Sequence, residues 1–281
     1  AAIYAAETTH KSKDRDQHAL NRLLPYFRGR SMVSIRRADV RAYISARQKS
    51  GVSLSTVRRE LRFASAAANY VRIEREIDLP NPFRSLRIPE SESRVRWLTR
   101  PQVDRLVSAA ALYARTPHLP AFIRIAVNTG CRRGELLGLE WSRVDLSRAL
   151  ITLEAAHTKT ACRRTVPLNA DALAAVLDLR KWCDQHRPGS PWVFPSSTTS
   201  GHIRWLNTAF RNACDRADIH DFRIHDLRHT CASWLVMAGA DLYTVRDLLG
   251  HASITQTEKY AHLAPSRVAA AVALLDEKSP G

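Results

Sequence analysis

The sequence is poor in the features that mark disulfide-rich, metal-binding and membrane proteins. Its five cysteines are odd in number and widely scattered, and they form no Cys-x-x-Cys pair. This argues against a disulfide framework and a zinc site, and it favours a reducing, cytoplasmic location. No apolar run approaches the roughly 20 residues that a membrane span needs. The start lacks both a signal-peptide layout and an initiator Met, so we expect a fragment or a processed form of a soluble protein.

Lysine and acidic residues are also scarce. Only seven of the 43 basic side chains are Lys, and the 27 acidic residues leave a net charge of +16. Arg offers a planar pair of donors that matches a phosphate group, so this excess predicts a nucleic-acid partner. A coding bias toward Arg would explain the ratio of Arg to Lys, but it would not explain the net positive charge.

Residues 1–90 show no strand-like alternation and carry 18 basic and 9 acidic residues. Apolar side chains recur there at helical spacing in three patches, and Ser34 is a candidate N-cap of the second. The patches are Ala19, Leu20, Leu23 and Leu24; Val40, Tyr43 and Ile44; and Val57, Leu61, Ala64, Ala68 and Val71. The third also carries Arg58, Arg59 and Arg62. We expect a helical bundle with a basic, DNA-binding face, the alternative being ordinary solvated arginines.

A proline-rich tract at residues 79–97 breaks the helical pattern and predicts a domain boundary, with a linker at 91–97. The second domain, residues 98–281, opens with a capping box formed by Thr99 and Gln102. Strand character is confined to residues 149–154, 164–168 and 191–195, the first two flanking a hairpin tip. Residues 170–182 and most of the chain after 205 read as helical. The sequence therefore predicts a mainly α second domain with one small sheet.

Cationic side chains lie at several turns of this domain. Arg132 follows Gly130, a predicted helix C-cap, and Glu135 is placed three residues on, where it could orient the guanidinium. Lys159 lies at the hairpin tip, and His225 and Arg228 share one helix face, opposite a buried stripe of Leu227, Cys231, Trp234 and Leu235.

Further candidates follow near the end of the chain. His251 comes after Gly250, another predicted C-cap, and Ser253 with Gln256 predicts a capping box for a helix carrying Tyr260. Such groups suit phosphoryl transfer: cations stabilise the phosphorus, Lys159 protonates the leaving oxygen and Tyr260 attacks. Taken singly, each has a commoner structural role, to which we assign His229 and His262. The residues alone indicate a site for an anionic ligand.

Five motifs follow one another along the second domain: N-T-G-C-R-R-G-E-L, T-K-T-x-x-R-R-T-V-P-L, H-D-L-R-H, L-L-G-H and T-E-K-Y-A-H-L. Box by box they resemble the tyrosine recombinase (phage integrase) family over about residues 96–270. Residues 1–90 more loosely resemble the helical, SAM-like core-binding domain of that family. The resemblance implies a mainly α fold with a small β-sheet, the second domain having the DNA breaking-rejoining enzyme fold. The apolar Val268, Val272 and Leu275 then predict a C-terminal helix that docks into a neighbouring protomer or folds back on its own domain.

The resemblance also implies roles for residues. Arg132, Lys159, His225, Arg228, His251 and Tyr260 match the catalytic positions, with Glu135 as the acidic supporter and Lys159 as the general acid. Tyr260 would form a 3′-phosphotyrosine and release a 5′-hydroxyl, and no metal, ATP or other cofactor is expected. Four protomers would exchange strands between double-stranded DNA attachment sites through a Holliday junction.

Further expectations concern partners and alternatives. Free in solution, the protein is expected to be a monomer or weak oligomer. Accessory DNA-bending proteins are candidate partners, and a bacterial or phage-encoded, nucleoid-associated protein of the cytoplasm is expected. Two other functions stay open, a type IB topoisomerase that relaxes supercoils and a catalytically inactive DNA-binding protein.

Overall fold

The computed structural model describes residue 4 and residues 13–84, 86, 88–89, 95–112, 117–154 and 163–265 of the 281-residue chain. Lys159 and the predicted C-terminal helix lie outside the described residues. The chain divides into two compact units, Ala1–Ser93 and Arg94–Gly281, which are referred to as unit 1 and unit 2. Among the described residues, no helix has both the length and the apolar character that crossing a membrane requires.

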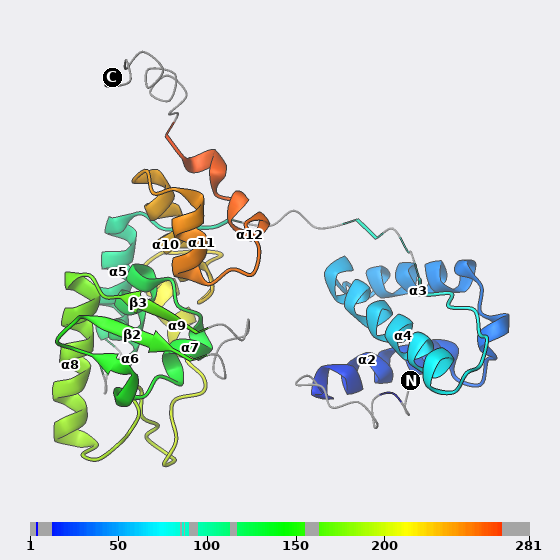
Figure 1. Cartoon of the computed structure of the whole chain (residues 1–281), viewed down its shortest axis with the longest axis horizontal. Coiled ribbons are helices and arrows are strands. Elements are labelled where there is room, and N and C mark those ends of the chain that lie inside the picture. The colour runs from blue at the N-terminus through cyan, green and yellow to red at the C-terminus, as the bar shows by residue number, and fades with distance from the viewer. Residues whose placement is uncertain are drawn as a thin grey trace, which may run out of the picture. The chain divides into compact units, whose positions relative to one another are not determined.

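Unit 1 is helical (Figure 1). Its elements are α2 (Lys13–Phe27), the 3₁₀ helix η1 (Met32–Ser34), α3 (Arg37–Lys49) and α4 (Leu54–Glu74). The apolar positions predicted from the sequence form much of its core, since Ala19, Leu20, Leu23, Val40, Tyr43, Val57, Leu61 and Ala64 are buried. Leu24 is exposed, and Ala68 and Val71 are half-buried.

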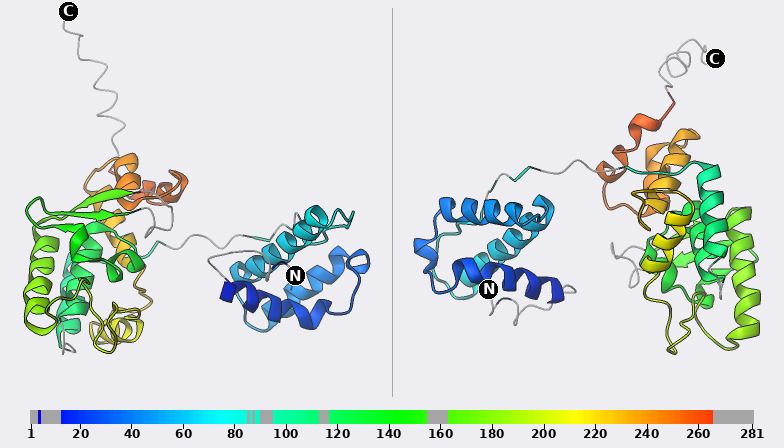
Figure 2. Two further views of the ribbon diagram at one scale, coloured as in Figure 1. Left: turned by 60° about the horizontal axis from the view of Figure 1, so that its bottom comes forward. Right: turned by 180° about the vertical axis from the view of Figure 1, so that it is seen from behind.

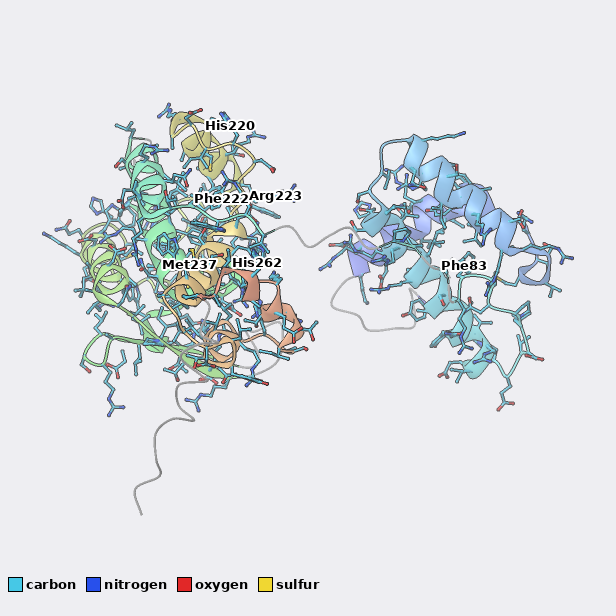
Figure 3. All side chains as sticks on the ribbon, turned by 90° about the horizontal axis from the view of Figure 1, so that it is seen from above. Phe83, His220, Phe222, Arg223, Met237 and His262 are labelled. Carbon is cyan, nitrogen blue, oxygen red and sulfur yellow. The ribbon has the colours of Figure 1, made fainter. Side chains whose placement is uncertain are left out.

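One local prediction for unit 1 is corrected. The N-cap of α3 is Arg36, not Ser34, and the backbone N–H of Arg36 donates to Asp39 at 2.8 Å. Part of the proline-rich tract packs onto unit 1, because the Asn81 amide donates to the Ser65 carbonyl at 3.1 Å. Phe83 is buried in the same core beside α4 (Figure 3). The tract is therefore anchored at its start.

Unit 2 is built around a core of helices that pack against one another (Figures 1 and 2). Its helices are α5 (Arg100–Ala111), α6 (His118–Thr129), α7 (Arg133–Leu137), α8 (Ala170–His186), α9 (Asn207–Arg216), α10 (Asp226–Met237), α11 (Leu242–Leu249) and α12 (Thr255–Glu258), with 3₁₀ turns η2 (Trp141–Arg143) and η4 (Ala261–Leu263). Helix α6 packs against α5, α8 and α10. The capping box at the start of α5 is confirmed, as Thr99 and Gln102 exchange both hydrogen bonds.

The small sheet differs from the prediction in its third strand. The strands β2 (Leu150–Leu153) and β3 (Arg164–Pro167) pair antiparallel as expected, with Ile151 opposite Val166. The partner on the other edge of β2 is β1 (Val144–Asp145), which immediately precedes it. Residues 191–195 form only isolated bridges, Glu140 with Trp192 and Pro195 with His202. The short turn after β1 makes pairing with β2 local, whereas residues 191–195 lie beyond α8.

Helix α10 is buried on nearly every side. Leu227 and Cys231 are buried as predicted, but Trp234 and Leu235 are half-buried and most of the remaining helix is also covered. The Trp234 indole N–H donates to the Leu98 carbonyl at 2.9 Å, and Leu98 N–H donates to Thr230 Oγ1 at 3.2 Å. These bonds hold the entry to α5 against α10. A helix so enclosed is a rigid base for the polar side chains on it.

Candidate active site

The first part of the site is set by a left-handed glycine. Gly130 ends α6 with φ +63°, as predicted, and a Cβ there would lie 2.3 Å from Cδ2 of Leu249. The turn leaves Arg132 at the N-cap of α7, where its guanidinium donates to the Gly250 carbonyl at 2.9 Å. A residue with a Cβ would both strain this turn and push α11 away. Gly130 therefore fixes where Arg132 projects.

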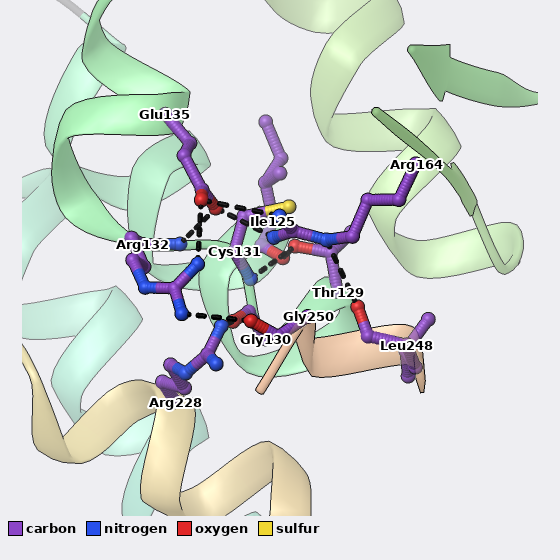
Figure 4. Close-up of polar contacts among 10 residues, drawn as sticks. All are labelled: Ile125, Thr129, Gly130, Cys131, Arg132, Glu135, Arg164, Arg228, Leu248 and Gly250. Carbon is purple, nitrogen blue, oxygen red and sulfur yellow. Dashed lines mark hydrogen bonds and ion pairs between the residues drawn. The ribbon is translucent and has the colours of Figure 1, made fainter. Parts of the chain in front are cut away.

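Glu135 is the anionic centre of this network (Figure 4). Its carboxylate accepts from the backbone N–H of Arg132 at 2.8 Å and from the Arg132 guanidinium at 2.9 Å. It also accepts two hydrogen bonds from Arg164, at 2.6 and 3.2 Å. Burial raises the pKa of Glu135, but the hydrogen bonds from Arg164 and from the Arg132 backbone outweigh it, so the net pKa is lowered. Glu135 thus stays charged and holds both arginines.

Arg164 also belongs to this network, although the sequence pattern identified it only as part of a predicted strand. It opens β3, and besides binding Glu135 it donates to the Leu248 carbonyl at 3.2 Å. A Cβ on Gly250, which ends α11 with φ +64°, would lie 2.9 to 3.1 Å from three atoms of Arg164. The second Arg of the R-R-T-V-P-L motif was the available signal. Arg164 joins the sheet, α7 and the end of α11 in one place.

Arg228 is the most deeply buried cation of the set, only 3% exposed. One guanidinium nitrogen donates to the Gly130 carbonyl at 2.8 Å (Figure 4). The other terminal nitrogen is buried and has no hydrogen-bond partner among the residues that the structure describes. Burial, and then repulsion from Arg132, lower the pKa of Arg228 to about 10. A buried, charged donor without an acceptor is costly, so this nitrogen marks a position for an anion.

The two predicted histidines lie in the same positive field. His225 is the N-cap of α10 and is exposed at its outer edge, but desolvation by the surrounding residues, followed by the charges of Arg228 and Lys259, lowers its pKa. His251 follows Gly250, and its Nδ1 is 2.8 Å from Oγ1 of Thr257. Burial, then Arg228 and Lys259, lower the pKa of His251 to about 3. The positive field therefore disfavours the protonated form of both rings while the site lacks an anion.

Tyr260 lies just beyond α12 rather than on it. The N-cap of α12 is Ile254, so the predicted capping box of Ser253 and Gln256 does not form; Ser253 Oγ instead accepts from the N–H of Thr255 at 3.2 Å. Tyr260 is 1% exposed and packs with α10 and α11 against Ala232, Val236, Val245 and Leu249. Its burial raises the pKa of the phenol.

The Tyr260 hydroxyl is hydrogen-bonded to His229, a residue for which the sequence predicted a structural role. The oxygen lies 2.5 Å from Nδ1 of His229, whose ring stands edge-on to His225 with centroids 5.2 Å apart. Lys259 Nζ lies 5.1 Å from the centre of the Tyr260 ring. His262, also predicted to be structural, is exposed.

Six of the seven predicted site residues can thus be placed. Arg132 and Glu135 are bonded to one another, Arg228 reaches the Gly130 carbonyl next to them, and His225 lies beside the His229–Tyr260 pair. His251 directly follows Gly250, whose carbonyl accepts from Arg132. The seventh, Lys159, lies outside the described residues. Arg164, His229 and Lys259 were not among the predicted site residues.

The basic helix of unit 1 shows a mixed outcome. Arg59 and Arg62 are exposed on α4, whereas the Arg58 guanidinium is half-buried and donates to the Ile88 carbonyl of the same unit. Arg59 and Arg62 therefore present their charge to solvent, and Arg58 is partly engaged in holding its own unit together.

Comparison with known proteins gives a consistent picture. Residues 96–267 match the model of the phage integrase family. The integrase of Salmonella phage P22 is 34% identical over 208 residues, which cover 69% of this chain and 51% of that protein. The tyrosine recombinase XerC of Xylella fastidiosa strain M23 is 30% identical, covering 83% of this chain and 78% of its own. XerD of Neisseria meningitidis serogroup B is 31% identical, covering 84% and 81%.

Solved structures share the fold at lower identity. The Tn1549 transposon integrase in complex with a circular intermediate DNA matches with a TM-score of 0.79 and 19% identity, over 99% of this chain and 97% of that one. A lambda integrase dimer bound to a COC′ core site matches with a TM-score of 0.72 and 20% identity, over 91% and 93%. The motifs, the fold and these matches agree that the chain belongs to the phage integrase family of tyrosine recombinases, enzymes that cut and rejoin DNA.

Proposed function

We propose that this protein is a site-specific recombinase that breaks and rejoins DNA through a 3′-phosphotyrosine at Tyr260. The observation that carries the proposal is the buried guanidinium nitrogen of Arg228, which has no acceptor among the described residues. A DNA phosphate oxygen would supply that acceptor. Guanidinium groups suit this role because they bind phosphate by charge-assisted hydrogen bonds.

The local electrostatics support an anion at the same place. Besides burial, Arg228 lowers the pKa of both His225 and His251, and Arg132 in turn lowers the pKa of Arg228, so the DNA-free site disfavours the positive charge that it holds. A phosphodiester would relieve this repulsion, and the doubly charged transition state would do so more strongly. The site is therefore proposed to stabilise the transition state more than it stabilises the bound phosphodiester.

Each residue has a definite task in this scheme. Arg132, Arg228, His225 and His251 bind the non-bridging phosphate oxygens, and Glu135 holds Arg132 in place. Tyr260 attacks phosphorus, and Lys159 protonates the departing 5′-oxygen, which is otherwise a poor leaving group. The 5′-hydroxyl of a partner strand then attacks the phosphotyrosine, so the bond energy is retained without ATP. The cations supply the charge stabilisation, and no metal or other cofactor is part of the scheme.

The proposed partner is double-stranded DNA, with four protomers acting together at paired sites. The net charge of +16 and the exposed Arg59 and Arg62 support DNA binding. Among proteins with this fold, lambda integrase has been solved as a tetramer bound to a Holliday junction. We further propose that the free protein is a monomer or weak oligomer and that accessory DNA-bending proteins assist it. The protein itself is proposed to be cytoplasmic and associated with the nucleoid.

The test identifies the DNA site and the nucleophile together. Wild-type protein and Tyr260→Phe are incubated with sheared genomic DNA of the source organism, denatured with detergent, and any attached DNA is sequenced. We expect adducts at a defined sequence with wild type only, and mass spectrometry should place the nucleotide on Tyr260. A nicked duplex built from that sequence then allows single-turnover kinetics.

Other outcomes point to the alternatives. If wild-type protein forms no adduct while it still binds DNA, it is a binding protein with an inactive site. If it rapidly relaxes plasmids of unrelated sequence, topoisomerase activity is the better description.

A further inference from the structure

The hydrogen bond between Tyr260 and His229 has a defined direction. Tyr260 is 1% exposed, and Nδ1 of His229 is the only hydrogen-bond partner of its hydroxyl within the part of the chain that the structure describes. A buried O–H group left without an acceptor would cost about 1–3 kcal/mol. The phenol therefore donates, and Nδ1 of His229 accepts and carries no proton.

The charges around His229 keep it in that state. On α10 it faces His225 and Arg228, and from the segment that follows α11 it faces His251, Lys259 and Tyr260. Burial, and then the positive charge of Lys259, lower the pKa of His229 to about 3. The imidazole is consequently neutral at pH 7, and its lone pair on Nδ1 points at the tyrosine proton.

We propose that His229 is the general base that takes the proton of Tyr260 during DNA cleavage, an inference that rests on the proposed recombinase function. The O–H bond of Tyr260 breaks as its oxygen bonds to phosphorus, and the proton moves to Nδ1. The bond from phosphorus to the 5′-oxygen breaks, and that oxygen takes a proton from Lys159. In rejoining, the incoming 5′-hydroxyl gives its proton to the now neutral Lys159 as its oxygen bonds to phosphorus. The bond from phosphorus to the tyrosine oxygen breaks, and the His229 imidazolium returns its proton to that oxygen.

Tyr260 needs such a base because its burial disfavours the free phenolate. Of the two histidines on this side of α10, only His229 bonds to the hydroxyl among the described contacts, while His225 lies one helical turn earlier with an exposed ring. One helical turn is about 5.4 Å long, so His229 lies within about one turn of the phosphate-binding residues His225 and Arg228 on α10. Anionic phosphate bound there offsets the repulsion between the new imidazolium and the nearby cations.

The decisive variant is His229→Asn, measured on the nicked duplex recovered with wild-type protein. Asn retains a hydrogen-bond acceptor but cannot take a proton at neutral pH. We expect the single-turnover rate of adduct formation at pH 7 to fall by about 100-fold or more, with half-saturating DNA concentration unchanged. The remaining rate should rise about tenfold per pH unit, because the phenol must then lose its proton to hydroxide. The wild-type rate should be nearly flat from about pH 6 to about pH 8.

The matched control is His220→Asn, since the His220 side chain is 80% exposed and lies at the surface of unit 2 (Figure 3). It should stay within about twofold of wild type, as expected of a change to an exposed group. A second measurement needs no variant. Nitrogen-15 NMR of histidine-labelled wild type at pH 7 should show the Nδ1 of His229 without a proton, and a protonated Nδ1 would overturn the proposal even if His229→Asn failed to fold.

The outcomes separate this inference from the proposed function. If wild type forms the Tyr260 adduct and His229→Asn matches its rate and pH profile, the general base is wrong while the recombinase function stands. If His229→Asn is faster than wild type, His229 restrains Tyr260 instead, and the proposal is overturned. If wild type forms no adduct with genomic DNA, both fail.

Discussion

Replacing Arg164 with Met tests whether the buried ion pair with Glu135 holds the site together. The two side chains are 9% and 2% exposed, and Arg164 makes two hydrogen bonds to the carboxylate. Removing one partner of a buried pair costs about 3–5 kcal/mol, because the other charge stays buried. Glu135 keeps its two bonds from Arg132, so we expect the lower end, about 3 kcal/mol. For a unit the size of Arg94–Gly281, this lowers Tm by about 6–12 °C.

Tryptophan fluorescence reports on unit 2 selectively, since all six Trp residues lie after residue 93. Thermal unfolding of the full chain can therefore be followed at this unit alone. The control is Arg148→Met, whose ion pair with Asp145 spans 3.9 Å with Arg148 79% exposed. It should cost less than about 1 kcal/mol. Arg164→Lys should fall between the two, because an ammonium cannot reproduce the two-pronged contact. If Arg164→Met is no more destabilising than Arg148→Met, the network does not anchor this region.

Three further predictions concern pH, backbone conformation and DNA. Because the pKa of folded Glu135 is lowered, its stabilisation is complete above the ordinary carboxyl range and is lost as pH falls through the folded-state pKa. The difference in urea-unfolding free energy between wild type and Glu135→Gln should thus be constant above about pH 5 and shrink below about pH 4. Gly250→Ala should lower Tm more than Gly189→Ala, since both have positive φ but only Gly250 faces side-chain atoms, and equal losses would contradict this. Arg59→Gln and Arg62→Gln should each reduce the salt dependence of binding to nonspecific duplex DNA by about one unit of slope, and an unchanged slope would remove them from the interface.

Local features were the ones most readily predicted from the sequence. The Thr99–Gln102 capping box and the left-handed Gly130 and Gly250 depend on residues within one or two turns, so short motifs were sufficient. The predictions that failed also concerned short segments, but the cause of each failure is tertiary packing. Ser253 and Gln256 have the spacing of a capping box, yet the packing of Tyr260 and Thr257 into the domain starts α12 later.

Strand pairing shows the same limit. The hairpin of β2 and β3 follows from alternation in two neighbouring segments, and it was predicted. The identity of the third strand was not, because the two-residue β1 is too short to show alternation, while residues 191–195 look strand-like but form only bridges. Very short strands are decided by the partner that is available, not by their own residues.

The sequence by itself determined the chemistry of this protein: the types and order of the cationic, imidazole and phenol groups, and the glycines that turn the chain beside them. Only the tertiary structure decided which groups meet. Glu135 binds Arg164 across 29 residues, and Tyr260 binds His229 across 31. Such pairs depend on how distant segments pack, and no local periodicity records that. The burial of Arg228, which leaves one nitrogen without an acceptor among the described residues, likewise arises from the helices packed around α10.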